Sequence, residues 1–97
     1  MSVVVYHFWS PTCAPCKAIK PIVEDLKEEF GSIRWESVDT SVDKSEISTR
    51  LGVSVVPTIA VVCHDNDGKV VNVEKHSGTQ VAGYYRILRN GLRFTQQ

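Results

Sequence analysis

The sequence predicts an α/β fold in which helices flank a mixed four-stranded sheet. A β-branched and aromatic run over residues 3–8 leads into an amphipathic helical pattern over residues 13–30. Later, two apolar runs separated by the turn sequence of residues 65–68 precede a second amphipathic helix. With the elements between them, the predicted order is β, α, β, α, β, β, α. A chain of 97 residues suffices for one domain over residues 1–97.

The first strand and the first helix have the clearest patterns. Residues 3–8 are apolar on both faces, as in a central strand covered by helices on both sides. The helix over residues 13–30 carries one apolar stripe along four turns, made of Ile19, Ile22, Val23, Leu26 and Phe30. We expect it to bend at Pro21, which removes a hydrogen bond inside the helix, and to end at Gly31.

Shorter elements follow the first helix. Residues 32–38 are predicted to form the second strand, and residues 39–41 have the turn and N-cap chemistry that begins a short helix. This helix is expected to end at about Leu51, before Gly52. Since Pro57 cannot donate a hydrogen bond within a central strand, the third strand is expected only after it, over residues 58–63.

The last part of the chain predicts a hairpin and a helix. The sequence Asp-Asn-Asp-Gly at residues 65–68 is a strong turn signal and joins the third strand to a fourth over residues 69–75. The final helix is predicted over residues 79–90, with Val81, Tyr85 and Leu88 on one face, and is expected to stop near Gly91.

Composition and charge exclude several classes of function. The 11 basic and 11 acidic residues balance, so we expect neither nucleic acid nor a membrane surface as a partner. No stretch approaches the roughly 20 apolar residues of a membrane helix, and the apolar N-terminal run lacks the basic flank of a signal peptide. Three cysteines, an odd number, argue against a fully oxidised secreted framework. We therefore expect a cytoplasmic protein.

Two of these cysteines, Cys13 and Cys16, lie at the junction of the first strand and the first helix. At the mouth of the helix, free backbone N–H groups and the positive end of the helix dipole stabilise a thiolate at Cys13. An ordinary cysteine has a pKa of about 8.5, so this stabilisation makes Cys13 the expected nucleophile. Cys16, one turn further along the same face, is the expected resolving thiol. Pro15 stiffens the loop between the sulfurs, and Lys17 adds positive charge that favours the thiolate.

These residues resemble the active site of the thioredoxin family, whose pattern is Trp-x-x-x-Cys-x-Pro-Cys-Lys and here occupies residues 9–17. Further features of the family occur in the same order, namely Pro21, Val56-Pro57-Thr58, Gly68 and Gly78. The match runs from about residue 3 to residue 92. The resemblance implies a minimal thioredoxin fold. It also implies a thiol-disulfide oxidoreductase that reduces or exchanges protein disulfides without a bound cofactor.

The resemblance also implies how a substrate is bound. A cis peptide bond before Pro57 would turn the Val56 backbone outward, where it can pair with an extended substrate segment, and would keep metals from the two sulfurs. Trp9, expected to be half buried, Pro11 and Gly78 are the other residues implied at this surface. The implied partners are proteins that carry disulfides, and a reductase or another dithiol donor.

His7 is a departure from the family pattern. Thioredoxins have a buried aspartate at this position, which is thought to take the proton of the resolving thiol, and a lysine at about the position of Trp35. A neutral imidazole is cheaper to bury than an unpaired carboxylate. With an ordinary pKa near 6.5, His7 could accept a proton from Cys16 directly or through water. The alternative is a packed histidine that is hydrogen-bonded to the backbone.

The third cysteine, Cys63, is expected to be a buried and inert thiol at the end of its strand. A zinc site needs about four ligands, and the only plausible set would be Cys13, Cys16, Cys63 and His64. Because Cys63 is expected at a different strand end from the other two cysteines, no metal site is predicted.

Only 12 residues precede Cys13, whereas thioredoxins usually carry a further strand and helix before the strand that leads to the cysteines. We expect this leading unit to be absent and one edge of the sheet to be unpaired. The predicted state is a monomer that can dimerise weakly through this edge.

Two alternative functions remain open from the sequence. A glutaredoxin-like, glutathione-dependent oxidoreductase agrees with the short N-terminal part and the Pro57 loop, although Trp9 and Lys17 favour thioredoxin. The other alternative is a non-catalytic binding module that keeps its dithiol incidentally. The direction of electron flow depends on the reduction potential of the pair, which the sequence does not contain.

Overall fold

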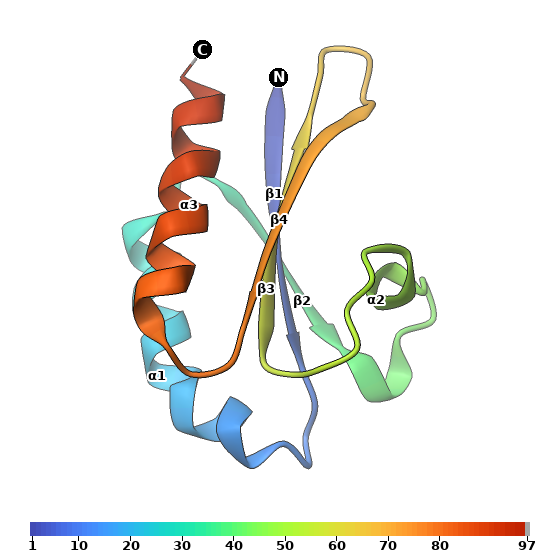
Figure 1. Cartoon of the computed structure of the whole chain (residues 1–97), viewed down its shortest axis with the longest axis vertical. Coiled ribbons are helices and arrows are strands. Elements are labelled where there is room, and N and C mark those ends of the chain that lie inside the picture. The colour runs from blue at the N-terminus through green and yellow to red at the C-terminus, as the bar shows by residue number, and fades with distance from the viewer. Residues whose placement is uncertain (97) are drawn as a thin grey trace.

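A sheet of four strands forms the centre of the structure, a computed structural model that describes residues 1–96 (Figure 1). The strands are β1 (Ser2–Trp9), β2 (Arg34–Asp39), β3 (Thr58–His64) and β4 (Val70–Ser77). Their spatial order is β2-β1-β3-β4, with β1 parallel to β2 and the other neighbours antiparallel. The predicted mixed four-stranded sheet is confirmed.

The helices cover the two faces of this sheet unequally. The long helices α1 (Ala14–Glu29) and α3 (Val81–Thr95) lie on one side, and the single turn α2 (Ile47–Arg50) lies on the other (Figure 1). The first residue and the β3–β4 hairpin lie at one end of the sheet, and α1 begins at the opposite end. The end of the sheet at which α1 begins is therefore opposite the end at which β1 begins and α3 ends (Figure 1).

The core lies between the sheet and the two long helices. Every second residue of β1 and β3 faces it, as the pleat of a strand requires. Its buried members from the sheet and the helices include Val3, Val5, Ile59, Val61, Ile19, Val23, Leu26, Tyr84, Ile87 and Leu88. Pro21 lies inside α1 as predicted, and the helix ends at Glu29 with Phe30 as its C-cap, close to the expected Gly31.

The predicted helix between β2 and β3 is wrong in extent. The segment forms a 3₁₀ turn, η1 (Thr40–Val42), and then only the four residues of α2. Asp43 interrupts the helix, because its carboxylate accepts hydrogen bonds from the backbone N–H and the hydroxyl of Ser48, at 2.9 and 2.7 Å. Gly52, with φ of 70°, follows α2 as predicted.

The predicted end of the last helix near Gly91 is also wrong, because α3 continues to Thr95. A Cβ atom at Gly91 would come within 2.7 Å of Val61 Cγ1 and 3.3 Å of Val3 Cγ1. This glycine therefore permits the close approach of α3 to the sheet and does not end the helix. Leu92 and Phe94, beyond it, pack against the core.

The hairpin turn is confirmed, since Asp65 Oδ1 accepts hydrogen bonds from the N–H groups of Asp67 and Lys69, both at 2.9 Å. The strand β2 has a neighbour on one side only, so its outer edge is unpaired within residues 1–96. None of the helices in this part of the chain is long and apolar enough to cross a membrane.

Candidate active site

Cys13 lies at the mouth of α1, where the sequence places it. The residue is the N-cap of the helix, with extended backbone angles, and its Sγ accepts a hydrogen bond from the N–H of Cys16 at 3.1 Å. The turn before it is closed by a hydrogen bond from the N–H of Cys13 to the carbonyl of Ser10. Pro15 stands in the first turn of α1, where a missing N–H costs no helical hydrogen bond. A donor N–H aimed at sulfur favours the thiolate over the thiol.

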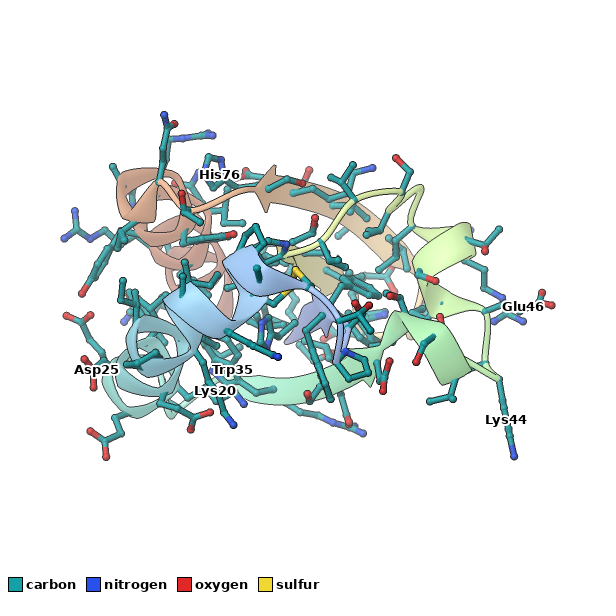
Figure 2. All side chains as sticks on the ribbon, turned by 90° about the horizontal axis from the view of Figure 1, so that it is seen from below. Lys20, Asp25, Trp35, Lys44, Glu46 and His76 are labelled. Atoms are coloured by element: carbon teal, nitrogen blue, oxygen red, sulfur yellow. A yellow bond between two sulfur atoms is a disulfide. The ribbon has the colours of Figure 1, made fainter. Side chains whose placement is uncertain are left out.

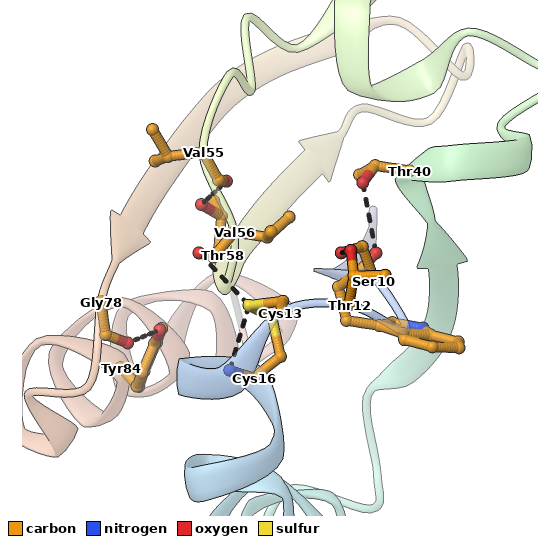
Figure 3. The surroundings of a disulfide bond; sticks show 11 residues. Ser10, Thr12, Cys13, Cys16, Thr40, Val55, Val56, Thr58, Gly78 and Tyr84 are labelled. Carbon is orange, nitrogen blue, oxygen red and sulfur yellow. Dashed lines mark hydrogen bonds between the residues drawn. A yellow bond between two sulfur atoms is a disulfide. The ribbon is translucent and has the colours of Figure 1, made fainter.

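Cys16 lies one turn inside the helix and is buried, with 6 % of its surface exposed. The two cysteines form a disulfide, with 5.2 Å between their Cα atoms (Figure 3). Cys13 is the more accessible of the two. This difference in exposure agrees with an attacking sulfur at Cys13 and a resolving sulfur at Cys16.

The loop before β3 faces the disulfide. The Val56–Pro57 bond is cis, and the carbonyl oxygen of Val56 lies 3.7 Å from Cys13 Sγ (Figure 3). Thr58 holds this loop, since its hydroxyl donates to the carbonyl of Val55 at 2.7 Å. Pro57 itself is buried. The Val55–Pro57 backbone beside the disulfide is therefore held in place by Thr58, the first residue of β3.

Gly78 adjoins this loop from the connection between β4 and α3. Its N–H donates to the carbonyl of Pro57 at 3.0 Å, and its own carbonyl accepts from the hydroxyl of Tyr84. Its φ of 100° lies in a region that glycine adopts without strain. Gly78 and Pro57, which are both predicted to bind substrate, are therefore neighbours joined by a backbone hydrogen bond.

Sequence reasoning missed Tyr84 and Thr58 as supports of this surface. Tyr84 is fully buried, and burial raises the pKa of its hydroxyl to about 12, so the group remains a hydrogen-bond donor at neutral pH. The helical pattern placed Tyr85 on the apolar face with Val81 and Leu88 and left Tyr84 unassigned, but Tyr84 is the fully buried tyrosine and Tyr85 is half buried. Thr58 directly follows Pro57, and a β-branched residue with a hydroxyl at that place was the available signal.

A hollow of about 460 Å³ opens beside Cys16, and we call it the His7 hollow. Its lining includes His7, Trp9, Pro11, Cys16 and Lys17. Trp9 is half buried, as predicted, and its indole N–H donates to the hydroxyl of Ser37 on β2 at 2.8 Å. Pro11 and Lys17 are exposed at the rim. Five of the predicted site residues therefore surround one opening next to the resolving sulfur.

His7 is buried in this hollow, with 8 % of its surface exposed. Neither ring nitrogen has a hydrogen-bond partner among residues 1–96, so the alternative of a histidine bonded to the backbone is wrong. The pKa of His7 is lowered to about 4, mainly by burial and also by the charge of Lys27, while the charge of Glu24 opposes the shift. His7 is therefore neutral at pH 7, with one nitrogen able to donate and the other to accept a proton.

Trp35 does not share this environment. Its indole N–H donates to the carbonyl of Phe30 at 3.1 Å, and its ring packs against the core. Trp35 thus links β2 to Phe30, the C-cap residue of α1. Its side chain is uncharged and cannot replace the lysine of the family pattern.

Cys63 lies apart from the site, as predicted. It pairs with Val3 near the far end of β3 from Pro57 and is buried. Burial, assisted by Glu74, raises the pKa of its thiol. Within the described part of the chain, no group of three or more His, Cys, Asp or Glu side chains is placed to hold a metal ion.

Comparison with known proteins places this geometry among thioredoxins. The thioredoxin family model matches residues 1–84. A thioredoxin of Bacillus subtilis (strain 168) is 40 % identical over 70 residues, which are 71 % of this chain and 64 % of that protein. A thioredoxin of Pyropia yezoensis is 32 % identical over 60 % of this chain and 54 % of its own length. The matches thus span less than two thirds of these relatives.

Solved structures agree over a larger part of the chain. The thioredoxin of Fasciola hepatica superposes with a TM-score of 0.73 at 26 % identity, over 93 % of this chain and 81 % of that one. The short form of thioredoxin f from spinach chloroplast gives a TM-score of 0.75 at 24 % identity, over 93 % and 76 %. The second likeness supports the fold alone. From the matching family model and the geometry of its cysteine pair, we conclude that the chain belongs to the thioredoxin family.

Proposed function

We propose that this protein is a thiol-disulfide oxidoreductase that reduces or exchanges disulfides in other proteins through Cys13 and Cys16. One observation carries the proposal, namely the position of Cys13 Sγ at the N-cap of α1, bonded to Cys16 and facing the Val56–Pro57 loop. The family match supports it and favours it over a glutaredoxin-like activity. No bound cofactor enters the reaction.

The reaction consists of two exchange steps. The Cys13 thiolate attacks one sulfur of a substrate disulfide, a mixed disulfide forms, and the other substrate sulfur leaves as a thiolate. Cys16 then loses its proton and attacks Cys13 Sγ, which releases the first substrate sulfur and leaves the Cys13–Cys16 disulfide. Two electrons pass to the substrate, and a dithiol partner returns them by the same steps in reverse.

The substrate segment would bind in an extended conformation beside the Val56–Pro57 loop. Backbone groups of Val56 are directed to this surface next to Cys13, and an added strand gains affinity from main-chain hydrogen bonds. Gly78, Trp9 and Pro11 would contact the substrate on either side. Lys17, near the first turn of α1, would favour the thiolate through its charge.

His7 would relay the proton that Cys16 loses. Since the pKa of His7 is about 4, the imidazole would not keep this proton at neutral pH. Because both ring nitrogens are buried, it would pass the proton on through water that enters the His7 hollow. Replacing His7 with Ala or Gln should slow release of the mixed disulfide more than its formation. Equal slowing of both steps, or of neither, would refute the relay.

The proposed partners are disulfide-bearing proteins and a reductase or another dithiol donor. A relative of 25 % identity, thioredoxin f2, has been solved in complex with ferredoxin:thioredoxin reductase, which supports a reductase as a partner class. We also propose a cytoplasmic location, which the odd cysteine count supports. Fractionation of cells that express the tagged full chain tests this location.

Weak self-association through the outer edge of β2 stays a prediction. The edge carries an ion pair, Arg34 Nη2 to Glu36 Oε1 at 2.6 Å, and charged side chains on an edge oppose strand addition. We therefore expect a monomer except at high concentration. A monomeric mass in light scattering at millimolar protein would argue against the dimer.

Insulin reduction by dithiothreitol tests the activity. The wild-type protein should accelerate the reaction, and Cys13→Ser should abolish the acceleration. Cys16→Ser should instead accumulate mixed disulfides with substrate, whereas Cys63→Ala serves as the matched control and should keep full activity. A wild-type protein that gives no acceleration and a Cys16→Ser variant that traps nothing would leave a binding module as the correct account.

A further inference from the structure

One face of α1 brings one thiol and three charged side chains to the His7 hollow. Cys16, Lys20, Glu24 and Lys27 follow at spacings of four, four and three residues, and all four line the hollow. Seen from the end at which α1 begins, Lys20 lies toward the β2 side of the molecule, and His76 lies across from it (Figure 2). His7 faces this stripe from β1.

Among residues 1–96, α1 is the only element that brings charged side chains to the His7 hollow. Its neighbours across the sheet are Ser37 on β2 and Ile59 on β3, neither of which titrates. Because both ring nitrogens lack a hydrogen-bond partner among the described residues, local charge acts on His7 without competition from a fixed hydrogen bond. The charges of α1 are therefore the ones that can adjust its proton affinity.

Glu24 and Lys27 form a weak pair above the hollow, with Lys27 Nζ 3.7 Å from Glu24 Oε1. Burial is the largest cause of the low pKa of His7. The positive charge of Lys27 is the second cause and also lowers the pKa, whereas the negative charge of Glu24 raises it. Lys20 lines the same hollow and is exposed to solvent. Neither Lys20 nor Lys17, which also lines the hollow, is among the charges that shift the pKa of His7, whereas Lys27 and Glu24 are.

We propose that Glu24 and Lys27 act through His7, in opposite directions, on the proton transfer that lets Cys16 resolve the mixed disulfide. This inference rests on the proposed oxidoreductase function. In that transfer the S–H bond of Cys16 breaks and one nitrogen of His7 takes the proton. Because both ring nitrogens are buried, the imidazolium then passes a proton on through water that enters the His7 hollow. Glu24 stabilises the transient imidazolium and Lys27 destabilises it, so both are positioning residues and neither touches the substrate.

Titration of His7 by NMR in the oxidised full chain tests the electrostatic part. Lys27→Gln should raise the pKa of His7 and Glu24→Gln should lower it, each by about 0.2–0.7 of a unit, because both charges are partly or largely exposed. Lys20→Gln is the matched control, with the same change of charge in the same hollow, and should shift His7 by less. The double variant should lie near the wild type.

Rapid-mixing kinetics on a substrate disulfide tests the functional part. Release of the mixed disulfide should become faster in Lys27→Gln and slower in Glu24→Gln, by about threefold per pKa unit at a Brønsted coefficient of about 0.5, while its formation is unchanged. A merely structural role would slow both variants. Shifts in one direction for both, or pKa shifts without matching release rates, overturn the inference.

Failure of the proposed function gives a different result. In that case the wild-type protein reduces no insulin, and the inference falls with it. When insulin is reduced and the two variants release the mixed disulfide at the wild-type rate, the oxidoreductase stands and only the role of Glu24 and Lys27 is refuted.

Discussion

Lowering the pH from 7.5 to 4.5 should destabilise the fold through the single residue His7. The pKa of His7 is about 4 in the folded chain and about 6.5 in an unfolded one. The unfolded state thus binds more protons between these values, so stability is present above about pH 6.5 and is lost as the pH falls toward 4. At about 1.4 kcal/mol per unit, the whole window of pKa values corresponds to about 3.5 kcal/mol, of which about 2.5 kcal/mol is lost by pH 4.5.

Urea unfolding of the oxidised protein, followed by circular dichroism at both pH values, measures this loss. The comparison variant is His7→Gln, which keeps a polar side chain but does not titrate in this range. The variant should lose about 2.5 kcal/mol less than the wild type between pH 7.5 and 4.5. The interval also lies above the range in which Asp43, with a pKa lowered to about 2, becomes protonated.

Equal losses in the wild type and the variant would refute the reasoning. They would mean that His7 charges as readily in the folded state as in the unfolded one. The hollow would then hydrate an imidazolium, and the proton transfer proposed between Cys16 and His7 would lose its electrostatic basis.

Three further predictions concern other parts of the chain. Gly91→Ala should lower the free energy of unfolding by about 1–3 kcal/mol through crowding of Val61, and an unchanged urea midpoint would contradict the close packing of α3. Asp43→Asn should lower the protection factor of the Ser48 amide against hydrogen exchange, because the carboxylate that accepts from this N–H is lost. Lowering the pH of the wild type from about 4 to 2 should have the same effect, because Asp43, whose pKa is lowered to about 2, then becomes protonated. Unchanged protection of Ser48 would show that this cap does not hold α2. Cys63 should react with a thiol reagent only after unfolding, because it is buried and its pKa is raised, and rapid labelling in the native reduced protein would be the opposite result.

The parts of the fold that sequence predicted correctly are those in which a repeating pattern meets a large apolar surface. The apolar stripe of α1 and the continuous apolar runs of β1 and β3 can be buried only where a helix packs on a central part of the sheet. The cysteine pair was predictable because strand, turn and helix mouth are contiguous in the chain. The meeting of Gly78 with the Pro57 loop came only from the family resemblance, since no local pattern links residues so far apart.

The errors arise where one local signal has two physical meanings. Gly91 could end a helix or let it approach a sheet, and only the position of Val61 decides between these. Asp43 could lie within a helix or cap one, and its hydrogen bonds to Ser48 select the second. The depressed pKa of His7 was likewise hidden, because it depends on burial and on the facing charges of α1.

The rate of alkylation of Cys13 tests the central claim most directly. The reduced protein, with Cys63 replaced by Ala, would be treated with iodoacetamide across the pH range, and the modified residue would be identified by mass spectrometry. We expect Cys13 to react faster than Cys16 at neutral pH, with a midpoint below the value of about 8.5 of a free thiol. A midpoint at or above that of a model thiol, or preferential labelling of Cys16, would contradict the account of Cys13 as a thiolate stabilised at the start of α1.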